Sequence, residues 1–334
     1  MELEEDLKVW KDQKVLIIGE ALVDKYIYGF ADKISPDAPV PNVKVEETET
    51  YLGGIGLVLK FIKSLGGIPE ICTIIGNDFE GEFFLHKIKE LNISTEGILI
   101  DESIQTPQIT RIKAMNQHLL RLETDYSQDI SQDSIQTLFQ KIQNNFSDLS
   151  SILILDYGIG DLFTDSFVQD LLRVLEEKYT DVPIIARPDM AHYYLYEDID
   201  LIKINLQKAL RRMAIECCTD TSVTISGKRI QSETHCKNVL LNDIESFSYL
   251  FTQNQEKVKK IAPVLESPVR SYVAVGSVIM ATLGLSYAAN LDIQKAINIA
   301  LMAGTLSAVL PPVEFFNTEK LEKYIAKSPK KKEL

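Results

Sequence analysis

The 334-residue chain has 45% hydrophobic and 25% charged residues, the composition of a globular protein long enough for one large α/β domain. Its formal net charge of −13 argues against a nucleic-acid-binding protein, which would need a basic face, so we expect no nucleic acid as a partner. We expect no membrane partner either. The four cysteines show no CxxC spacing, so we expect reduced thiols, a cytoplasmic location and no metal site.

Strands and helices alternate along most of the chain. Continuous apolar runs of strand length occur at several places, and amphipathic stretches of helical period lie between them. The predicted strands are Lys14–Gly19, 70–75, Ser151–Leu155 and 183–186, and the predicted helices are 53–65, 80–91 and Asp165–Lys178. This alternation predicts an α/β fold with a mostly parallel sheet covered by helices on both faces.

Two segments depart from this pattern, at about 26–50 and 98–122. Both contain alternating β-branched stretches, such as 43–45 and 108–112. Such stretches predict a small antiparallel β lid that projects from the main sheet. No long linker, repeat or low-complexity tract divides the chain, so we expect residues 1–334 to form a single domain that carries this lid.

The segment 271–291 is uncharged and nominally long enough to cross a bilayer. It is, however, rich in Gly, Ala, Ser and Thr. A helix buried on all sides within the α/β core accounts for this composition better than a membrane span does.

Five motifs in order give the chain a family resemblance. They are IIGEALVDKYIYG from residue 17, ISPDAPVP at 34–41, the pair Gly53-Gly54, IGNDFEGE at 75–82 and NQHLLRLE at 116–123. Together they resemble the ribokinase/PfkB carbohydrate kinases and, within them, the heptose-7-phosphate kinases of ADP-heptose biosynthesis. The resemblance extends over about 14–325 and implies a ribokinase-like fold, with a sugar bound between sheet and lid.

The resemblance also implies a substrate site. Its residues would be Asp24, Gly53, Gly54, Asn116, Gln117 and Arg121. Asp24 would accept hydrogen bonds from sugar hydroxyls, with a helix N-cap or a turn as the alternative role. The glycines would let the backbone approach the sugar, or would only form a tight strand-to-helix turn. Successive strand residues face opposite ways, so only one of Asn116 and Gln117 faces the sugar.

The phosphate-donor motif of the family is altered. These kinases carry DTxGAGD at the start of a helix, where glycines form an anion hole and the last aspartate is the base. The matching residues here are Ser271, Tyr272, Val273, Ala274, Val275, Gly276 and Ser277. Both aspartates are therefore serine, and a serine hydroxyl lacks the basicity to take a proton near neutral pH. Ala274 and Val275 also disfavour a positive φ.

Further family positions on the donor side differ as well. Lys208 replaces the acid of the N-x-x-E motif that begins at Asn205, which reverses the charge where a divalent cation would bind. Asp243 and Glu245 align with the family turn near the nucleotide, where their negative charges would repel the phosphates of the donor. The remaining changes are Leu57 for an asparagine, Ile159 for a lysine, and Arg187-Pro188-Asp189 for DPK.

These substitutions predict a pseudokinase with no catalytic residue retained and no cofactor, although the family uses ATP and Mg²⁺. Such a protein would bind a sugar phosphate or a partner. One alternative is an active heptose-phosphate kinase with a rearranged site, in which Asp156 or Asp243 replaces the base. Another is a structural or assembly subunit, and we expect a homodimer formed through the lid.

Overall fold

The computed structural model describes residues 2–115, 117–124, 129–159, 162–265 and 267–327. A nine-stranded sheet runs in the order β13-β12-β11-β10-β9-β8-β1-β4-β5. The strands from β11 to β5 are parallel, and β12 and β13 extend the sheet in antiparallel pairings. They are β1 (Lys14–Gly19), β4 (Ile68–Gly76), β5 (Ile98–Asp101), β8 (Ser151–Leu155), β9 (Ile184–Arg187), β10 (Leu201–Asn205), β11 (Asn238–Asn242), β12 (Ser248–Thr252) and β13 (Lys259–Ile261).

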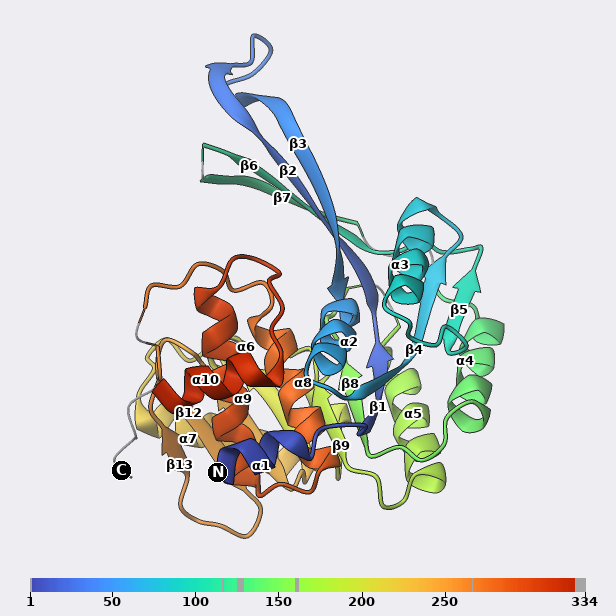
Figure 1. Ribbon diagram of the computed structural model, residues 1–334, viewed down its shortest axis with the longest axis vertical. Coiled ribbons are helices and arrows are strands. Elements are labelled where there is room, and N and C mark those ends of the chain that lie inside the picture. The colour runs from blue at the N-terminus through green and yellow to red at the C-terminus, as the bar shows by residue number, and fades with distance from the viewer. Residues whose placement is uncertain (1, 116, 125–128, 160–161, 266, 328–334) are drawn as a thin grey trace.

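Helices cover both faces of this sheet, as the sequence predicts (Figure 1). Successive residues of β1 pack into two apolar cores. Val15 and Ile17 belong to the first core, and Leu16 and Ile18 belong to the second. The first core includes α1 (Glu2–Lys8), α2 (Ile55–Ser64), α3 (Phe79–Glu90), α8 (Val275–Ala288), α9 (Ile293–Val309) and α10 (Thr318–Lys327). The second includes α4 (Gln132–Asn144), α5 (Asp165–Lys178), the 3-10 turn η1 (Tyr193–Leu195), α6 (Leu206–Arg212) and α7 (Asp220–Thr234).

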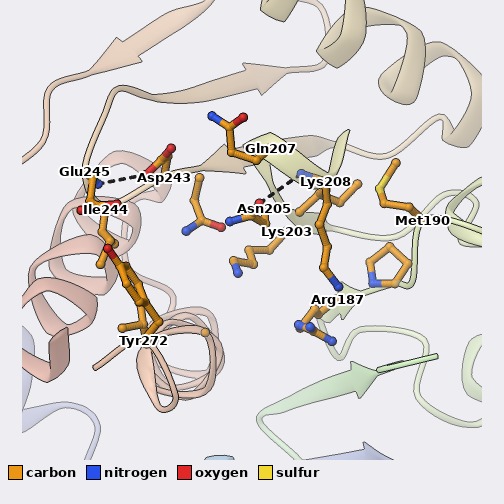
Figure 2. A pocket seen from close by; sticks show the side chains of 15 residues that line it. Arg187, Met190, Lys203, Asn205, Gln207, Lys208, Asp243, Ile244, Glu245 and Tyr272 are labelled. Atoms are coloured by element: carbon orange, nitrogen blue, oxygen red, sulfur yellow. Dashed lines mark hydrogen bonds between the residues drawn. The ribbon is translucent and has the colours of Figure 1, made fainter. Parts of the chain in front are cut away.

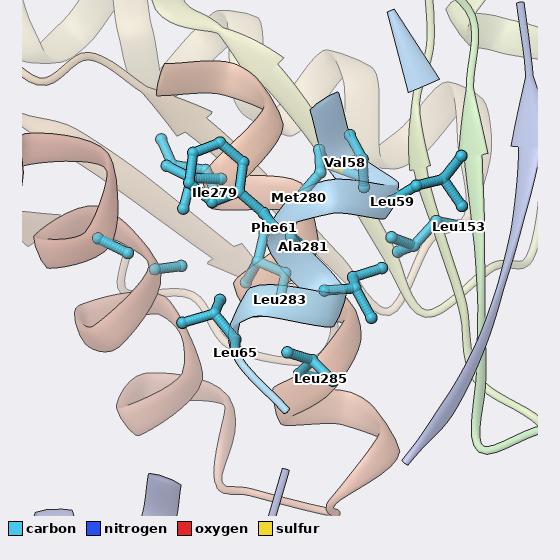
Figure 3. Close-up of a cluster of buried hydrophobic side chains, with 14 of the residues drawn as sticks. Val58, Leu59, Phe61, Leu65, Leu153, Ile279, Met280, Ala281, Leu283 and Leu285 are labelled. Carbon is cyan, nitrogen blue, oxygen red and sulfur yellow. The ribbon is translucent and has the colours of Figure 1, made fainter. Parts of the chain in front are cut away.

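Helix α8 lies at the centre of the first core. Figure 3 shows Phe61 of α2, and Leu65 directly after this helix, beside Met280 and Leu283 of α8. The first turn of α8 begins at the edge of the sheet, and nearly all of its later residues are buried. This confirms the prediction of a buried helix within 271–291. None of the helices described is both long and apolar enough to span a membrane.

A second sheet of four strands projects from the main sheet as the lid (Figure 1). Its order is β3-β2-β6-β7, with antiparallel pairings inside each hairpin and a parallel pairing between β2 and β6. The strands are β2 (Ala21–Ile34), β3 (Pro41–Gly54), β6 (Gln108–Ala114) and β7 (Gln117–Thr124). Burial along β2 falls from its first residues toward Ile34, so the base of the lid is packed and its far end is exposed.

The predicted lid segment 98–122 is too long at its start. Residues Ile98–Asp101 form β5, which pairs in parallel with β4 at the edge of the main sheet. The lid part of this segment begins only at β6. Three apolar residues followed by Asp101 are compatible with a strand of either sheet. The segment joins the main sheet because helix α3 brings the chain back beside β4.

Candidate functional site

Asp24 lies in β2 where the lid leaves the main sheet, and only 3% of the residue is exposed. Arg111 of β6 donates a hydrogen bond from Nη1 to Asp24 Oδ1. Burial raises the pKa of the Asp24 carboxyl, and the positive charge of Arg111 opposes the shift. A sugar hydroxyl would therefore have to share this carboxylate with Arg111.

Gly53 and Gly54 end β3 beside this carboxylate. A Cβ added at Gly53 would lie 2.7 Å from Asp24 Oδ2, so a larger residue would displace the acid. Gly54 has φ 49° and ψ −127° and precedes α2 as its N-cap, a backbone conformation that residues with a Cβ rarely adopt. Close approach thus requires the first glycine, and the strand-to-helix turn requires the second.

Arg121 of β7 lies opposite Arg111 in the pairing of β6 with β7. It forms an ion pair with Glu123, and its charge, like that of Arg111, opposes the rise that burial causes in the pKa of Asp24. Two lid cations, Arg111 and Arg121, therefore act on the Asp24 carboxylate at the base of the lid.

The other two lid residues proposed from sequence lie near the turn of the β6–β7 hairpin. Gln117 begins β7 opposite Ala114, and its side chain is exposed four residues before Arg121. Asn116 lies outside the described residues. The structure therefore brings Arg121 and the glycines to Asp24, and it places Gln117 farther along the lid.

Two buried acids lie behind this site, after β1 and β8. The backbone N–H of Tyr157 donates to Glu20 Oε2 at 2.7 Å, and burial together with the charge of Asp156 raises the pKa of Glu20 well above its ordinary value. Asp156 accepts hydrogen bonds from the Tyr196 hydroxyl at 3.1 Å and the Gly158 N–H at 2.9 Å. Burial also raises the pKa of Asp156. Interior donors therefore occupy both oxygens of Asp156.

A cleft of about 330 Å³ opens at the carboxyl ends of β9, β10 and β11, next to the start of α8 (Figure 2). We call it the α8 cleft. Its lining residues are Arg187, Pro188, Met190, Lys203, Ile204, Asn205, Gln207, Lys208, Asn242, Asp243, Ile244, Glu245, Tyr272, Val275 and Gly276. Open α/β sheets bind their ligands at the carboxyl ends of their strands.

Three cations line one side of the α8 cleft: Arg187 at the end of β9, Lys203 in β10 and Lys208 in α6 (Figure 2). Burial lowers the pKa of the Lys203 ammonium to about 7, and the charges of Arg187 and Lys208 add to the shift. Burial and the charge of Arg187 likewise lower the pKa of Lys208. The three groups repel one another, so an anion in the cleft would relieve them.

Acidic and aromatic side chains form the opposite side of the α8 cleft. Asp243 accepts a hydrogen bond from the Glu245 N–H through Oδ1 at 2.9 Å. A hydrogen bond to Glu245 raises the pKa of the Tyr272 hydroxyl. Asn205 caps α6, because its Oδ1 accepts from the Lys208 N–H at 3.1 Å. The side-chain oxygens of Asp243 and Asn205 therefore already accept hydrogen bonds within local turns.

Ser277 lies in the first turn of α8 and is 7% exposed. Its side chain hydrogen-bonds the Tyr157 hydroxyl, so it is directed into the protein interior. Ala274 is the N-cap of α8, with φ −96° and no side-chain hydrogen bond. No residue of the described stretch from Ser271 to Ser277 has a positive φ. The backbone here is an ordinary helix start.

The donor-side residues singled out from sequence converge in space. Asn205, Lys208, Asp243, Val275 and Gly276 line the α8 cleft. Ala274 and Ser277 are buried directly beside it.

Two positively charged side chains at these sites, Lys203 and Arg111, were not predicted from the sequence. Lys203 lies inside the apolar run LIKIN. A single lysine among residues of a buried strand was the one feature of the sequence that could have indicated a functional role. Arg111 lies in a lid strand of alternating pattern, where a charged residue is ordinary. Its ion pair with Asp24 depends on the parallel register of β2 and β6, which cannot be predicted from a local sequence pattern.

Comparison with known proteins assigns the chain to a family. The sequence profile of the pfkB family carbohydrate kinases matches residues 12–308. The chain belongs to this family. The bifunctional protein HldE of Desulfatibacillum aliphaticivorans is 26% identical over 305 residues, which cover 91% of this chain and 61% of that protein. HldE of Campylobacter curvus is 27% identical over 296 residues, with 89% and 61% covered. The chain spans about 60% of the length of these relatives.

Solved structures show the same fold. Phosphofructokinase-2 from Escherichia coli, in complex with substrates and products, superimposes with a TM-score of 0.78 at 14% identity, covering 95% of this pfkB-family chain and 100% of that chain. Ribokinase from Arabidopsis thaliana, complexed with ribose and ATP, gives a TM-score of 0.74 at 13% identity, with 95% and 100% covered. The α/β fold with its lid is thus the ribokinase-like fold.

Kinases of this family use ATP and Mg²⁺, and the three cations that line the α8 cleft do not fit a divalent metal ion. By the family resemblance Lys208 replaces the acid of the motif that begins at Asn205, and the side chains of Lys203 and Lys208 both line the cleft. In the described part of the chain, no three His, Cys, Asp or Glu side chains gather as a metal site. We therefore derive no catalytic step through magnesium.

Proposed function

We propose that this protein is a pseudokinase of the pfkB family, which binds a phosphorylated sugar or a partner and does not transfer phosphate from ATP. The observation that carries the proposal is Ser277. By the motif resemblance Ser277 aligns with the family base, and its side chain is buried and hydrogen-bonds Tyr157, which supports the proposal.

The chemistry of phosphoryl transfer supports this assignment. The transfer needs phosphate positioning, charge stabilisation and a group that orients or deprotonates the attacking hydroxyl. A general base contributes about 10²–10⁴ in rate, and a serine hydroxyl has no such basicity. Lys208 adds positive charge on the side where a metal would bind. Base and metal are thus disfavoured together.

The sugar side keeps the means to bind a ligand. Asp24 and Arg111 offer a buried acceptor and donor at the base of the lid, and Arg121 adds a second cation within electrostatic reach. Cations and a carboxylate together suit a sugar that carries a phosphate. The resemblance to heptose-7-phosphate kinases makes a heptose phosphate the leading ligand for this site.

A thermal-shift titration tests the proposal. Heptose 7-phosphate is expected to raise the Tm in a saturable way, whereas ATP with Mg²⁺ is expected to give no more shift than matched salt. Asp24→Asn should weaken the sugar-phosphate shift, and Lys228→Met, a change on exposed α7, should leave it unaltered. A saturable, magnesium-dependent ATP shift would contradict the pseudokinase assignment.

One observation favours an active kinase as a second candidate. The Asp243 carboxylate lines the same cleft as Gly276 and could stand in for the missing base. This alternative predicts ADP release that requires a sugar phosphate and disappears in Asp243→Asn. Wild-type protein without ADP release in this assay eliminates it.

A third role is assembly through the lid. The lid has two edge strands, β3 and β7, and carries exposed apolar side chains. These are Phe30, Ile34, Val40, Val45, Leu120 and Leu122. We propose that a second copy of the chain covers them in a homodimer, which a pseudokinase and a purely structural subunit could share.

A further inference from the structure

A second cavity, of about 280 Å³, lies between α2, α3, the end of β3 and the turn that connects α9 to α10. We call it the α2–α3 cavity. Within the described chain it shares no lining residue with the α8 cleft, and it includes none of the residues that the resemblance assigns to a substrate. Small-molecule sites have volumes of about 300–1,000 Å³, so this cavity has room for a small ligand.

The ammonium of Lys60 lines the α2–α3 cavity without an anionic partner. Its Nζ lies 3.9 Å from the centre of the Phe315 ring, and it forms no hydrogen bond or ion pair with a residue that the structure describes. Burial lowers the pKa of Lys60, and the positive charge of Lys87 adds to this shift. The face of an aromatic ring replaces a counter-ion only in part, so a partly desolvated ammonium still favours an anion.

Two phenylalanine rings contribute apolar surface to the same cavity. Phe83 of α3 and Phe315 of the turn both line it, and each remains partly exposed. Phe61 in the core fixes the position of Phe315, because the two ring centres are 4.6 Å apart. Rings of this kind pack well against the flat body of an apolar ligand. The cavity therefore offers apolar contact area beside a positive charge.

The turn that carries Phe315 has an unusual backbone at the cavity. Val313 lines the cavity with a φ of 53°. A β-branched residue rarely adopts a positive φ, because its side chain then collides with the backbone. Residues held in such conformations concentrate at ligand-binding and active sites. This strain is independent of the charge of Lys60, and both features indicate a ligand at the same place.

We propose that the α2–α3 cavity binds a small amphipathic monocarboxylate, with its carboxylate on Lys60 Nζ and its apolar body against Phe83 and Phe315. Glu90 limits the charge of the ligand. It lines the cavity in an ion pair with Lys87 at 2.8 Å, and its carboxylate would repel a second anionic group. The site therefore favours a monocarboxylate over a dicarboxylate. This inference goes beyond the proposed function and does not depend on it.

Isothermal titration of the full chain with 3-phenylpropanoate tests the site. Saturable binding of one molecule per chain is expected. The amide 3-phenylpropanamide has the same apolar body without the charge, and it should bind at least about tenfold more weakly because it loses the contact with the ammonium. Acetate has the charge without the body and should also bind at least about tenfold more weakly.

Variants of the cavity residues locate the binding. Lys60→Met keeps the aliphatic stem and should weaken the binding of 3-phenylpropanoate at least about tenfold. Glu90→Gln removes a repelling charge and should strengthen it about twofold. Both positions are at least partly exposed, so both variants should fold. Lys89→Met, at an exposed position of α3, is the matched control and should bind as the wild type does.

Three outcomes would overturn the site: no saturable binding of 3-phenylpropanoate, equal binding of the amide, or an affinity that Lys60→Met leaves unchanged. A further variant separates the two cavities. Lys208→Met, in the α8 cleft, should leave the affinity unaltered. Binding that Lys208→Met abolishes and Lys60→Met preserves would place the carboxylate in the α8 cleft and contradict the inference.

Discussion

Lys203 is a buried lysine whose charge lowers the stability of the folded protein. It interrupts an otherwise apolar buried strand, and its ammonium has no hydrogen-bond or ion-pair partner among the residues that the structure describes. A fold optimised only for stability would have an aliphatic residue there.

Replacement of this lysine by methionine should change how stability depends on pH. The pKa of Lys203 is about 7 in the folded protein, against an ordinary value of 10.5. Between these values the unfolded chain binds more protons, so wild-type stability rises with pH over about 7 to 10.5. The slope from this residue is at most about 1.4 kcal/mol per pH unit.

Lys203→Met should lack this contribution and be more stable than the wild type near pH 7. Urea unfolding of both proteins at pH 7, 8 and 9 measures the difference. Lys228→Met serves as the control, with the slope of the wild type. Identical slopes in wild type and Lys203→Met would show that the ammonium is not desolvated.

Two glycines near the site offer a matched comparison. Gly53→Ala would place a Cβ 2.7 Å from the Asp24 carboxylate, whereas Gly276→Ala meets only Lys203 Nζ at 3.9 Å. The first should lower the free energy of unfolding by about 1–3 kcal/mol, and the second should be close to neutral. Urea denaturation gives both values. Equal costs would argue against the close approach of β3 to Asp24.

At the scale of elements, Asp78 connects helix α3 by hydrogen bonds to the segment that precedes lid strand β6. Its Oδ1 accepts from the Gly81 N–H at 2.7 Å, and its Oδ2 accepts from the Thr106 N–H at 2.6 Å. Asp78→Ala should therefore cost about 2 kcal/mol, at the upper end for an N-cap. Ser131→Ala, which removes the cap of α4, should cost about 1 kcal/mol. Equal losses in urea unfolding would contradict the double role.

The main sheet was predictable because its signals are local. The strand Ser151–Leu155 and the helix Asp165–Lys178 have the predicted bounds, since an unbroken apolar run and a helical period identify each without tertiary information. The segment Ile98–Asp101 was assigned to the wrong sheet, because its four residues fit either one. Length and pattern alone do not decide between two neighbouring sheets.

The candidate site was predictable only through the family motifs. Lys208 and Gly276 were singled out by aligned position, and the structure places both on one cleft. The role of Lys203 could not be foreseen, because its isolation depends on what lies around it after folding. The Asp24–Arg111 pair likewise arises from strand register across two hairpins.

At the scale of the whole molecule, the lid should determine the oligomeric state. Size-exclusion chromatography with light scattering is expected to give twice the 37.7 kDa mass of the chain. Ile34→Lys, at a lid position that is 66% exposed, should give the monomer mass. Ile225→Lys, at a 60% exposed position on α7, is the control and should remain a dimer. A wild-type monomer at all concentrations would refute the lid interface.

The loss of phosphoryl transfer is the claim on which the account of the whole molecule depends. The most direct measurement is a coupled assay of ADP release by the purified chain, with ATP, Mg²⁺ and a panel of sugar phosphates that includes heptose 7-phosphate. We expect no release above that of a buffer control for any sugar. Release that requires a sugar phosphate, and that Ser277→Ala or Asp243→Asn abolishes, would show that the protein is a working kinase.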